Sequence, residues 1–568
     1  MAPKEILQIL NQQGSRVKQC IMVAFKSIIV LCGTYLSLVF NTQSAVFFVQ
    51  AFKGNNKLAA ACIAVLGLFV SAGLALLLFR FNFLEKLYSR LREHTRQTQI
   101  LLLMLAMLCA GTYIAQFFLW ANENIAYLNN AKAWWFHLPY ALGIVSQPAG
   151  LTLPQWLLSL VLFIPLSLFY MFLVTSLFQV VKSVLMSLSK YERRFMFIAA
   201  AAALLYVVFL YNSTSIYYGG MDRIYSFDSL PDSSYLINPF YYWSYYQYPL
   251  QPNLSLPLMM LAELVPDVFL WTVIARTLVQ LWLLLIAFIM LSRMISENPR
   301  VRLLTLLIFS FSFPTMILAV ITERRVITLA FVLIAIYQSL HTKRDEKLWL
   351  CAASGTVICN AYVLLLAVKP KKSFLKDILL CGLTFVFLAA FLGKISGLLD
   401  LQTQINNFKC RGWLDGGLDI GTKLTHYLNF VRSSFLAPLS QPSGNNSSWM
   451  MTITNTFSPI GICILLGAVC GFIVNYKNRL AQVAFAGVLA SFFFIFIKSL
   501  NIAENAVVLN TLFFGWGFVT LVIMAADKLL SGMRIKYWAL SGIAVGCFVY
   551  NVIAVIQLYK FGVAAYPV

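Results

Sequence analysis

Long uninterrupted apolar runs are the feature of this sequence that most restricts its fold. Many of them reach about 20 residues, the length that an α-helix needs to cross the hydrocarbon core of a bilayer. The 568-residue chain is 60% hydrophobic and 11% charged, which is more apolar surface than a soluble protein of this size buries. Backbone groups in lipid must pair within their own segment, so the runs predict helices. We therefore predict an all-α, polytopic integral membrane protein.

The apolar runs predict about 13 to 14 membrane segments. Their ranges are 21–40, 58–80, 99–120, 155–181, 195–211, 268–292, 303–321, 326–340, 348–367, 375–395, 459–475, 480–498, 506–526 and 538–558. The first run is too long for a signal-peptide core and is interpreted as a retained span. Basic segments between the runs are typical of cytoplasmic loops, and they place the N-terminus inside.

Two basic segments, 341–347 and 369–376, conflict with a simple alternation of sides. Only one apolar run separates them, and a single crossing does not return to the same side. Gly355 and Asn360 interrupt that run, so a re-entrant pair of half-helices buried in protein would resolve the conflict. The alternative is that one of the two basic loops lies outside.

Charge and metal-ligand residues exclude several classes of protein. The net charge of +22 fits the basic loops of a multi-span protein, and no nucleic-acid-binding motif accompanies it. Most of the eleven cysteines lie inside apolar runs and form no C-x-x-C pair. The four histidines are far apart in the sequence. We therefore expect no nucleic-acid partner and no metal site built from histidine or cysteine. A divalent cation as cofactor is left open.

Three long segments face outward in this topology, and they divide the chain into three regions. The outer segments are 121–153, 212–267 and 396–458. Residues 1–190 form a four-span membrane region, and residues 191–400 form a core that contains the acidic outer loop 212–267. Residues 401–568 form a third region. It consists of the outer loop 396–458 and four C-terminal spans.

The loop 212–267 combines aspartates with a dense aromatic stretch, "YYWSYYQY" at 241–248. Aromatic residues favour burial or a membrane interface, and loops this long are usually functional or disordered. Residues 254–267 are apolar but too short to cross a bilayer, so they predict a helix lying on the outer membrane surface.

Asp228 and Asp222 are the candidate catalytic residues of this loop, with Tyr225 as a neighbouring substrate-binding residue. Aspartates in such turn-forming sequence often serve only the turn. A carboxylate at the outer membrane edge would alternatively remove a proton from an alcohol acceptor, or hold a divalent cation against a diphosphate.

The order of a span, an outer loop bearing aspartates, a surface helix and a second span resembles the type C membrane glycosyltransferases. "FDS" at 227–229 and "NPFYYWSYYQYPL" at 238–250 carry the resemblance, which extends over about 195–400. It implies a polyprenyl-phosphate-linked sugar as donor and an acidic residue in the outer loop. The family's acidic loop follows the first span, whereas here the loop 41–57 has no acid and four spans precede the resembling region.

Charges also occur where the membrane makes them costly. Glu323, Arg324 and Arg325 join two apolar runs at the expected outer face. Glu323 either pairs one arginine while the other reaches the headgroups, or the arginines bind a phosphate. Arg276 lies deep in its span and is expected to face a cavity or to pair with an acid such as Glu263 or Asp267.

Lys498 and Arg411 are further candidate substrate-binding cations at the outer face. Lys498 ends an apolar run, and Arg411 belongs to the loop 396–458.

Three functions fit these features. The first is an inverting glycosyltransferase (hexosyltransferase) of the cell membrane, moving a sugar from a polyprenyl-phosphate donor to a glycan, lipid or protein acceptor at the extracytoplasmic face. The second is a polysaccharide polymerase or ligase of the cell envelope, with its essential residues in 396–458. The third is a transporter or flippase of lipid-linked oligosaccharides, because broken helices mark transporters. A bacterial inner membrane is the expected location.

Overall fold

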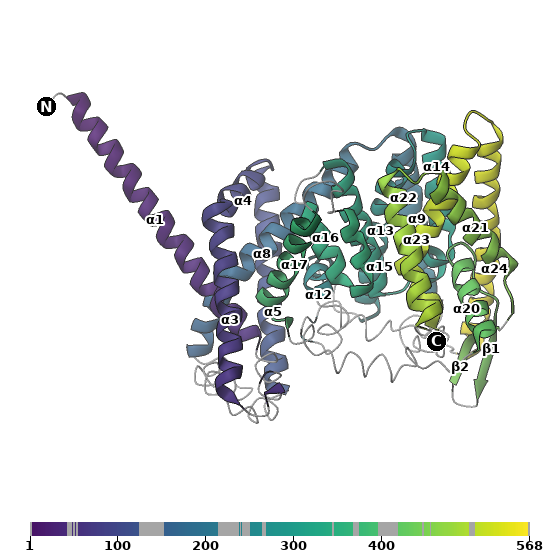
Figure 1. Cartoon of the computed structure of the whole chain (residues 1–568), viewed down its shortest axis with the longest axis horizontal. Coiled ribbons are helices and arrows are strands. Elements are labelled where there is room, and N and C mark those ends of the chain that lie inside the picture. Colours follow the sequence, from purple (N-terminus) through teal and green to yellow (C-terminus); the bar gives the residue numbers. More distant parts are fainter. Residues whose placement is uncertain are drawn as a thin grey trace. The chain divides into compact units, whose positions relative to one another are not determined.

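Ten helices long and apolar enough to cross a membrane confirm the predicted all-α, polytopic architecture (Figure 1). This count refers to the residues that a computed structural model of the chain describes. They are 3–41, 48, 51–52, 55–123, 153–213, 238, 240, 250–263, 269–342, 346–366, 374–395, 419–445, 448–454, 456–498 and 506–565. Four other predicted spans correspond to helices that are shorter or interrupted: α14 (Pro299–Phe311), α16 (Glu346–Thr356), α17 (Phe374–Phe391) and α21 (Pro459–Val474).

The chain forms two compact units. The N-terminal unit comprises Met1–Gln179, Pro239–Tyr245 and Val386–Asp400. The C-terminal unit comprises Val180–Asn238, Tyr246–Phe385 and Leu401–Val568.

Among its described residues, the N-terminal unit contains five helices and the end of α17. They are α1 (Pro3–Phe40), α3 (Asn56–Ala75) with its π-helical turn η1 (Leu76–Arg80), α4 (Phe83–Arg92), α5 (Arg96–Glu123) and most of α8 (Leu153–Met186). Its core contains Phe240, which comes directly before the aromatic stretch 241–248 of the predicted outer loop and is 2% exposed. The ring of Phe240 packs against Tyr113 and Phe117, and the ammonium of Lys394 lies 5.0 Å from its centroid. The aromatic stretch 241–248, which was expected to be buried or at a membrane interface, lies outside the described residues.

The C-terminal unit contains the remaining elements. Its helices are α9 (Lys190–Ser213), α12 (Gln251–Ala262), α13 (Phe269–Ile295), α14, η5 (Pro314–Leu318), α15 (Arg324–Tyr337), η6 (Gln338–Thr342), α16, η7 (Ile358–Leu366), the start of α17, α20 (Ile420–Arg432), α21, α22 (Arg479–Ser491), η8 (Phe492–Ile497), η9 (Ala506–Asn510), α23 (Thr511–Leu529) and α24 (Ile535–Ala565). Strands β1 (Ser440–Asn445) and β2 (Ser448–Ile453) form an antiparallel hairpin in which Ser440 pairs with Ile453.

Polar residues begin several helices of both units by satisfying an otherwise unpaired backbone N–H. The side chains of four such N-cap residues each accept a hydrogen bond from an N–H two or three positions later: Asn55, Asn298, Ser458 and Asn478. Two of these helices, α14 and α21, also have proline in their first turn, where its missing N–H costs no hydrogen bond.

The centre of the C-terminal unit is formed by α13, α15 and α23, which pack side by side (Figure 1). Of the apolar windows of these helices, 94% of the α23 residues, 83% of the α13 residues and 78% of the α15 residues are buried in protein. Only 22% of the α24 window is buried. The first three helices therefore form the protein interior, and α24 presents its apolar surface to lipid.

Close helix contacts in this unit depend on glycine. A Cβ atom on Gly471 of α21 would lie 2.0 Å from the carbonyl oxygen of Leu521 on α23, and one on Gly517 would lie 2.7 Å from the carbonyl oxygen of Ala484 on α22. Small residues let membrane helices approach closely, and dispersion contacts then hold them together.

Three features differ from the sequence-based picture or refine it. The predicted surface helix at 254–267 is instead α12, which is almost completely buried in protein because it packs against α13, α15 and α16. The hairpin of β1 and β2 was not predicted. The run 348–367 is interrupted as expected, since α16 ends at Thr356 and a 3₁₀ helix begins at Ile358.

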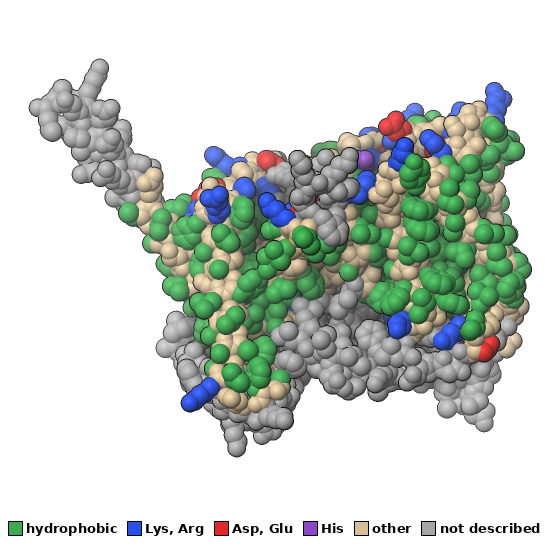
Figure 2. Space-filling model, viewed as in Figure 1, with side chains coloured by type: hydrophobic (Ala, Val, Ile, Leu, Met, Phe, Trp, Pro, Cys, Tyr) green, Lys and Arg blue, Asp and Glu red, His purple; other side chains and the backbone are tan. Residues whose placement is uncertain are grey.

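Lys and Arg side chains gather along one edge of the C-terminal unit (Figure 2). Next to this edge, the surface of the unit is mostly hydrophobic. This edge contains the ends of α13, α21 and α23 and the beginnings of α14, α22 and α24. The charge bias of membrane proteins predicts that it faces the cytoplasm.

The glycine contact between α21 and α23 gives a test of the packing. Gly471→Ala should lower the apparent thermal unfolding midpoint in detergent, because the helices must separate at a cost of about 1–3 kcal/mol. Gly546→Ala is the matched control, since no atom lies within 4 Å of its added methyl group. Equal midpoints for the two variants would show that α21 and α23 are not in this contact.

Candidate functional site

The first turn of α15 holds three consecutive charged residues inside the C-terminal unit. Glu323 is the N-cap of the helix, and its carboxylate accepts a hydrogen bond from the backbone N–H of Arg325 at 3.2 Å. Arg324 and Arg325 occupy the first two helical positions and are 6% and 5% exposed. Cations at the positive end of a helix dipole are unfavourable, so this arrangement needs a negative charge nearby.

Glu323 supplies that negative charge to Arg325. Its Oε1 lies 2.9 Å from Nη1 of Arg325, and the side chain of Glu323 is fully buried. The guanidinium of Arg325 also lies over the ring of Phe513 on α23, 5.8 Å from its centroid. The predicted pairing of Glu323 with one arginine is confirmed, but Arg324 is buried and does not extend outward as one prediction expected.

Polar residues on α9 and α13 hold the backbone that precedes α15. Gln280 on α13 accepts a hydrogen bond from the N–H of Glu323 at 3.2 Å and donates one to the carbonyl of Ile321. The hydroxyl groups of Thr277 and Thr322 are 2.7 Å apart. The hydroxyl of Tyr211 on α9 accepts from the N–H of Thr322 at 3.2 Å. These contacts fix the backbone that carries the side chains of Glu323, Arg324 and Arg325.

The end of the acidic loop segment is attached to the same place. Gln251, the first residue of α12, donates a hydrogen bond to the carbonyl of Arg324 at 2.6 Å. The N–H of Leu250 donates to the carbonyl of Gly355 at 2.9 Å, and the Leu250 side chain occupies the space beside that glycine. The chain that follows Asp222 and Asp228 in sequence is therefore fastened to the beginning of α15 and to the end of α16.

Arg276 has the acidic partner that the sequence predicted. Its Nε donates a hydrogen bond to Oε1 of Glu263 at 2.8 Å, and one of its terminal nitrogens contacts the same oxygen. Because α12 ends next to Glu263, this ion pair connects the end of α12 to α13.

Several buried polar atoms of this region form no hydrogen bond within the part of the chain that the structure describes. They include Oε2 of Glu323 and the side-chain amides of Asn253 and Asn360. Asn253 lies on α12 and Asn360 on η7, and both of these elements pack against α15. An unsatisfied buried polar group costs about 1–3 kcal/mol, so such groups usually mark a place where another polar partner binds.

The structure brings some of the predicted site residues together and not others. Glu323, Arg324 and Arg325 form one cluster, and Arg276 lies on the neighbouring α13. The ammonium of Lys498 lies over the ring of Phe493, 5.7 Å from its centroid, at the end of η8. Four further predicted residues lie outside the described residues: Asp222, Tyr225, Asp228 and Arg411.

The sequence-based prediction missed the uncharged members of the network, Gln251, Gln280, Thr277 and Tyr211. Gln280 carries the clearest signal, because it is an amide in the middle of an apolar run, where membrane helices rarely place one without a partner. Across the ranges that the structure covers, no three His, Cys, Asp or Glu side chains are close enough together to hold a metal ion.

No protein-family model matches this chain, and no curated protein or solved structure matches it. The function proposed below therefore rests on the residues and the geometry of the chain itself.

The buried ion pair gives a stability prediction. Glu323→Gln should lower the apparent unfolding midpoint strongly, because removing one partner of a buried ion pair costs about 3–5 kcal/mol. Glu263→Gln is the control, since the side chain of Glu263 is 34% exposed and its pair with Arg276 is expected to contribute about 1 kcal/mol or less. Thermal unfolding of the purified chain in detergent measures both. Similar shifts for the two variants would contradict the special position of Glu323.

Proposed function

We propose that this chain is a membrane glycosyltransferase that moves a sugar from a polyprenyl-phosphate donor to an acceptor at the extracytoplasmic face. The main support is the buried cluster at the beginning of α15. Glu323, Arg324 and Arg325 carry a net charge of +1, and they lie at a helix N-terminus that also favours an anion. The planar guanidinium group is the side chain best suited to two oxygens of one phosphate.

The unsatisfied polar atoms suit the sugar of such a donor. Oε2 of Glu323 is an acceptor for a hydroxyl group, and the amides of Asn253 and Asn360 both donate and accept. A hexose presents hydroxyl groups that would meet each of these requirements. A phosphate bound by the arginines would place its sugar within the same polar region.

In the proposed reaction, an acceptor hydroxyl attacks the anomeric carbon of the sugar. A new carbon–oxygen bond forms, and the bond from that carbon to the phosphate oxygen breaks with inversion. The phosphate leaves with the electron pair, and Arg324 and Arg325 stabilise its increased negative charge. Asp228 or Asp222 accepts the proton of the acceptor hydroxyl. Tyr225, Arg276, Lys498 and Arg411 are proposed to contribute to donor and acceptor binding.

A transporter of lipid-linked sugars is the second candidate, because the chain contains a broken helix. The interruption between Thr356 of α16 and Ile358 of η7 is of the kind that forms substrate sites in transporters. The two functions differ in outcome: a transferase forms a new glycosidic bond, whereas a transporter only changes the leaflet of its substrate.

The proposed bases give the first functional prediction. Asp228→Asn or Asp222→Asn should lower transfer from a panel of polyprenyl-phosphate hexoses by about 10²–10⁴-fold, the usual contribution of a general base. Asp232→Asn, an aspartate of the same loop, is the control and should retain activity. Full activity of both test variants would show that the catalytic base is not an aspartate of this loop. Loss of activity in Arg411→Gln alone would favour the polysaccharide polymerase.

Arg324 and Arg325 give the second functional prediction. Arg324→Gln should lower the turnover number by about 10²–10³-fold, because the leaving phosphate loses a fixed cation in the transition state. Arg534→Gln removes an exposed arginine from the basic edge and should change turnover less than about twofold. The assay follows radiolabelled sugar into the acceptor, and a parallel vesicle assay follows flipping. Flipping without transfer would replace the enzyme with the transporter.

A further inference from the structure

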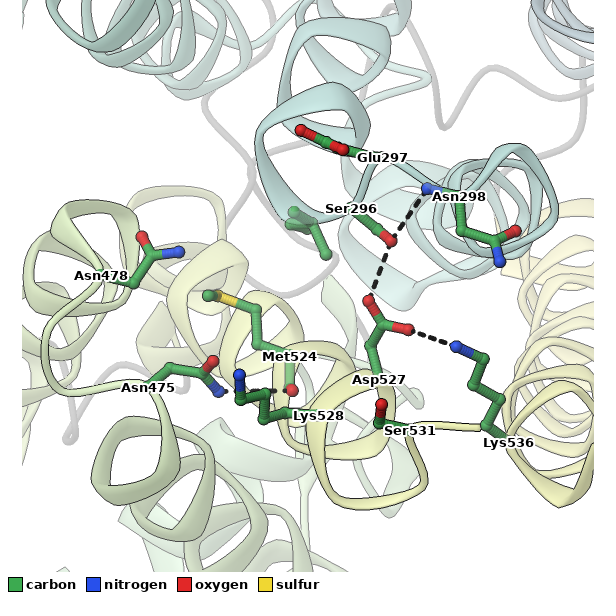
Figure 3. Close-up of a pocket in the computed structure, with 11 residues that line it drawn as sticks. Ser296, Glu297, Asn298, Asn475, Asn478, Met524, Asp527, Lys528, Ser531 and Lys536 are labelled. Atoms are coloured by element: carbon green, nitrogen blue, oxygen red, sulfur yellow. Dashed lines mark hydrogen bonds and ion pairs between the residues drawn. The ribbon is translucent and has the colours of Figure 1, made fainter. Parts of the chain in front are cut away.

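A polar pocket of about 380 Å³ lies at the basic edge of the C-terminal unit (Figure 3). Its walls come from the ends of α13, α21 and α23 and from the beginnings of α14, α22 and α24. It is distinct from the cluster at the start of α15. Phe513, which contacts Arg325, lies at the beginning of α23, whereas Asp527 lines the pocket near the end of that helix. The two residues are 14 positions apart, which corresponds to about 21 Å along the helix, most of the hydrocarbon core.

Two carboxylates line the pocket, Asp527 and Glu297. Glu297 is exposed and its carboxylate points away from Lys528 (Figure 3), whereas Asp527 is neutralised and held in place. Asp527 accepts a hydrogen bond from the hydroxyl of Ser296 at 2.9 Å and pairs with the ammonium of Lys536 at 3.0 Å (Figure 3). The amide of Asn298 donates to the hydroxyl of Tyr537 at 2.9 Å. The carboxylate of Asp527 therefore stabilises the wall and is not available as a ligand for a cation.

The opposite side of the pocket offers positive charge. Lys528 lines the pocket, is exposed, and forms no side-chain hydrogen bond or ion pair with the part of the chain that the structure describes. Asn478 caps α22 on the same side, so the positive end of that helix dipole faces the region (Figure 3). Segments 295–302, 475–479 and 527–536 together contain seven Lys and Arg residues and two acids, a net charge of +5. The unpaired Lys528 and the basic edge around the pocket therefore favour an anion.

Exposed apolar side chains beside the pocket place it at the level of lipid headgroups. Leu529, Met533 and Trp538 are 53%, 55% and 78% exposed, and they flank Lys528 and Lys536 in sequence. Tryptophan is enriched where a membrane helix passes the headgroup layer, and α24 has the smallest buried share among the ten described spans. A ligand that combines a phosphate with acyl chains matches both the charge and the apolar surface.

We propose that this pocket binds the phosphate headgroup of an anionic lipid from the leaflet at the basic edge. Lys528 and the beginning of α22 bind the phosphate, and the acyl chains lie along α24 near Trp538. The Asp527–Lys536 pair keeps the opposite wall in position. This site is independent of the proposed transfer reaction.

The test uses the purified full-length chain in a neutral detergent and two lipids with the same fluorescent acyl chain. Labelled phosphatidic acid should bind about tenfold more tightly than labelled phosphatidylcholine. Lys528→Gln should weaken the binding of phosphatidic acid about fivefold, the usual contribution of one cation near an anionic lipid. Lys477→Gln is the matched control, because it removes the same charge from the same edge outside the pocket, and it should change binding less than twofold.

Three outcomes would overturn the proposal. Equal affinity for the two lipids would show that the pocket does not recognise the phosphate. Equal losses in Lys528→Gln and Lys477→Gln would assign the preference to the general positive charge of the edge. Displacement of labelled phosphatidic acid by millimolar inorganic phosphate would show that the site is built for the free anion. A preference lost only in Lys528→Gln and resistant to phosphate would support the proposal.

Discussion

The buried carboxylate of Glu323 is the constraint on which the C-terminal unit depends. Burying an ion without a partner costs several kcal/mol, and two arginines at the positive end of a helix add to this cost. Glu323 reduces both costs, because it caps α15 and pairs with Arg325. Its own backbone must then be held in an extended conformation, which Gln280 on α13 does. One ion pair thus determines which residues of the neighbouring helices must be polar.

The central helices connect this cluster to the basic edge of the unit. α13 carries Gln280 in its first half and ends near Ser296, while α23 carries Phe513 at its start and Asp527 near its end. Both helices are mostly buried in protein and pack on α15, so neither end is free to move by itself. A phosphate proposed at one end and a lipid phosphate proposed at the other would lie on a common rigid support.

Much of the fold was predictable because lipid imposes simple rules on sequence. A run of about 20 apolar residues has few alternatives to a helix, and ten of the predicted spans correspond to the long apolar helices of the structure. α12 was misplaced because a short apolar segment with prolines has the same composition on a membrane surface as inside a protein. The hairpin of β1 and β2 was missed because short strands in polar loops have no comparable length rule.

The charged residues of the candidate site were predictable from the cost of placing charge in a membrane. Their uncharged partners were not predictable. Glu323, Arg324, Arg325 and Arg276 stand out in sequence since the membrane makes each of them costly. The partners of these charges depend on which helices are neighbours, which no local pattern specifies. Gln251 is an example of a residue whose role the sequence does not show. It donates one hydrogen bond to a residue 73 positions away, and this bond attaches the end of the acidic loop to α15. In the proposed chemistry, that attachment holds the end of the acidic loop beside the arginines that would bind the phosphate.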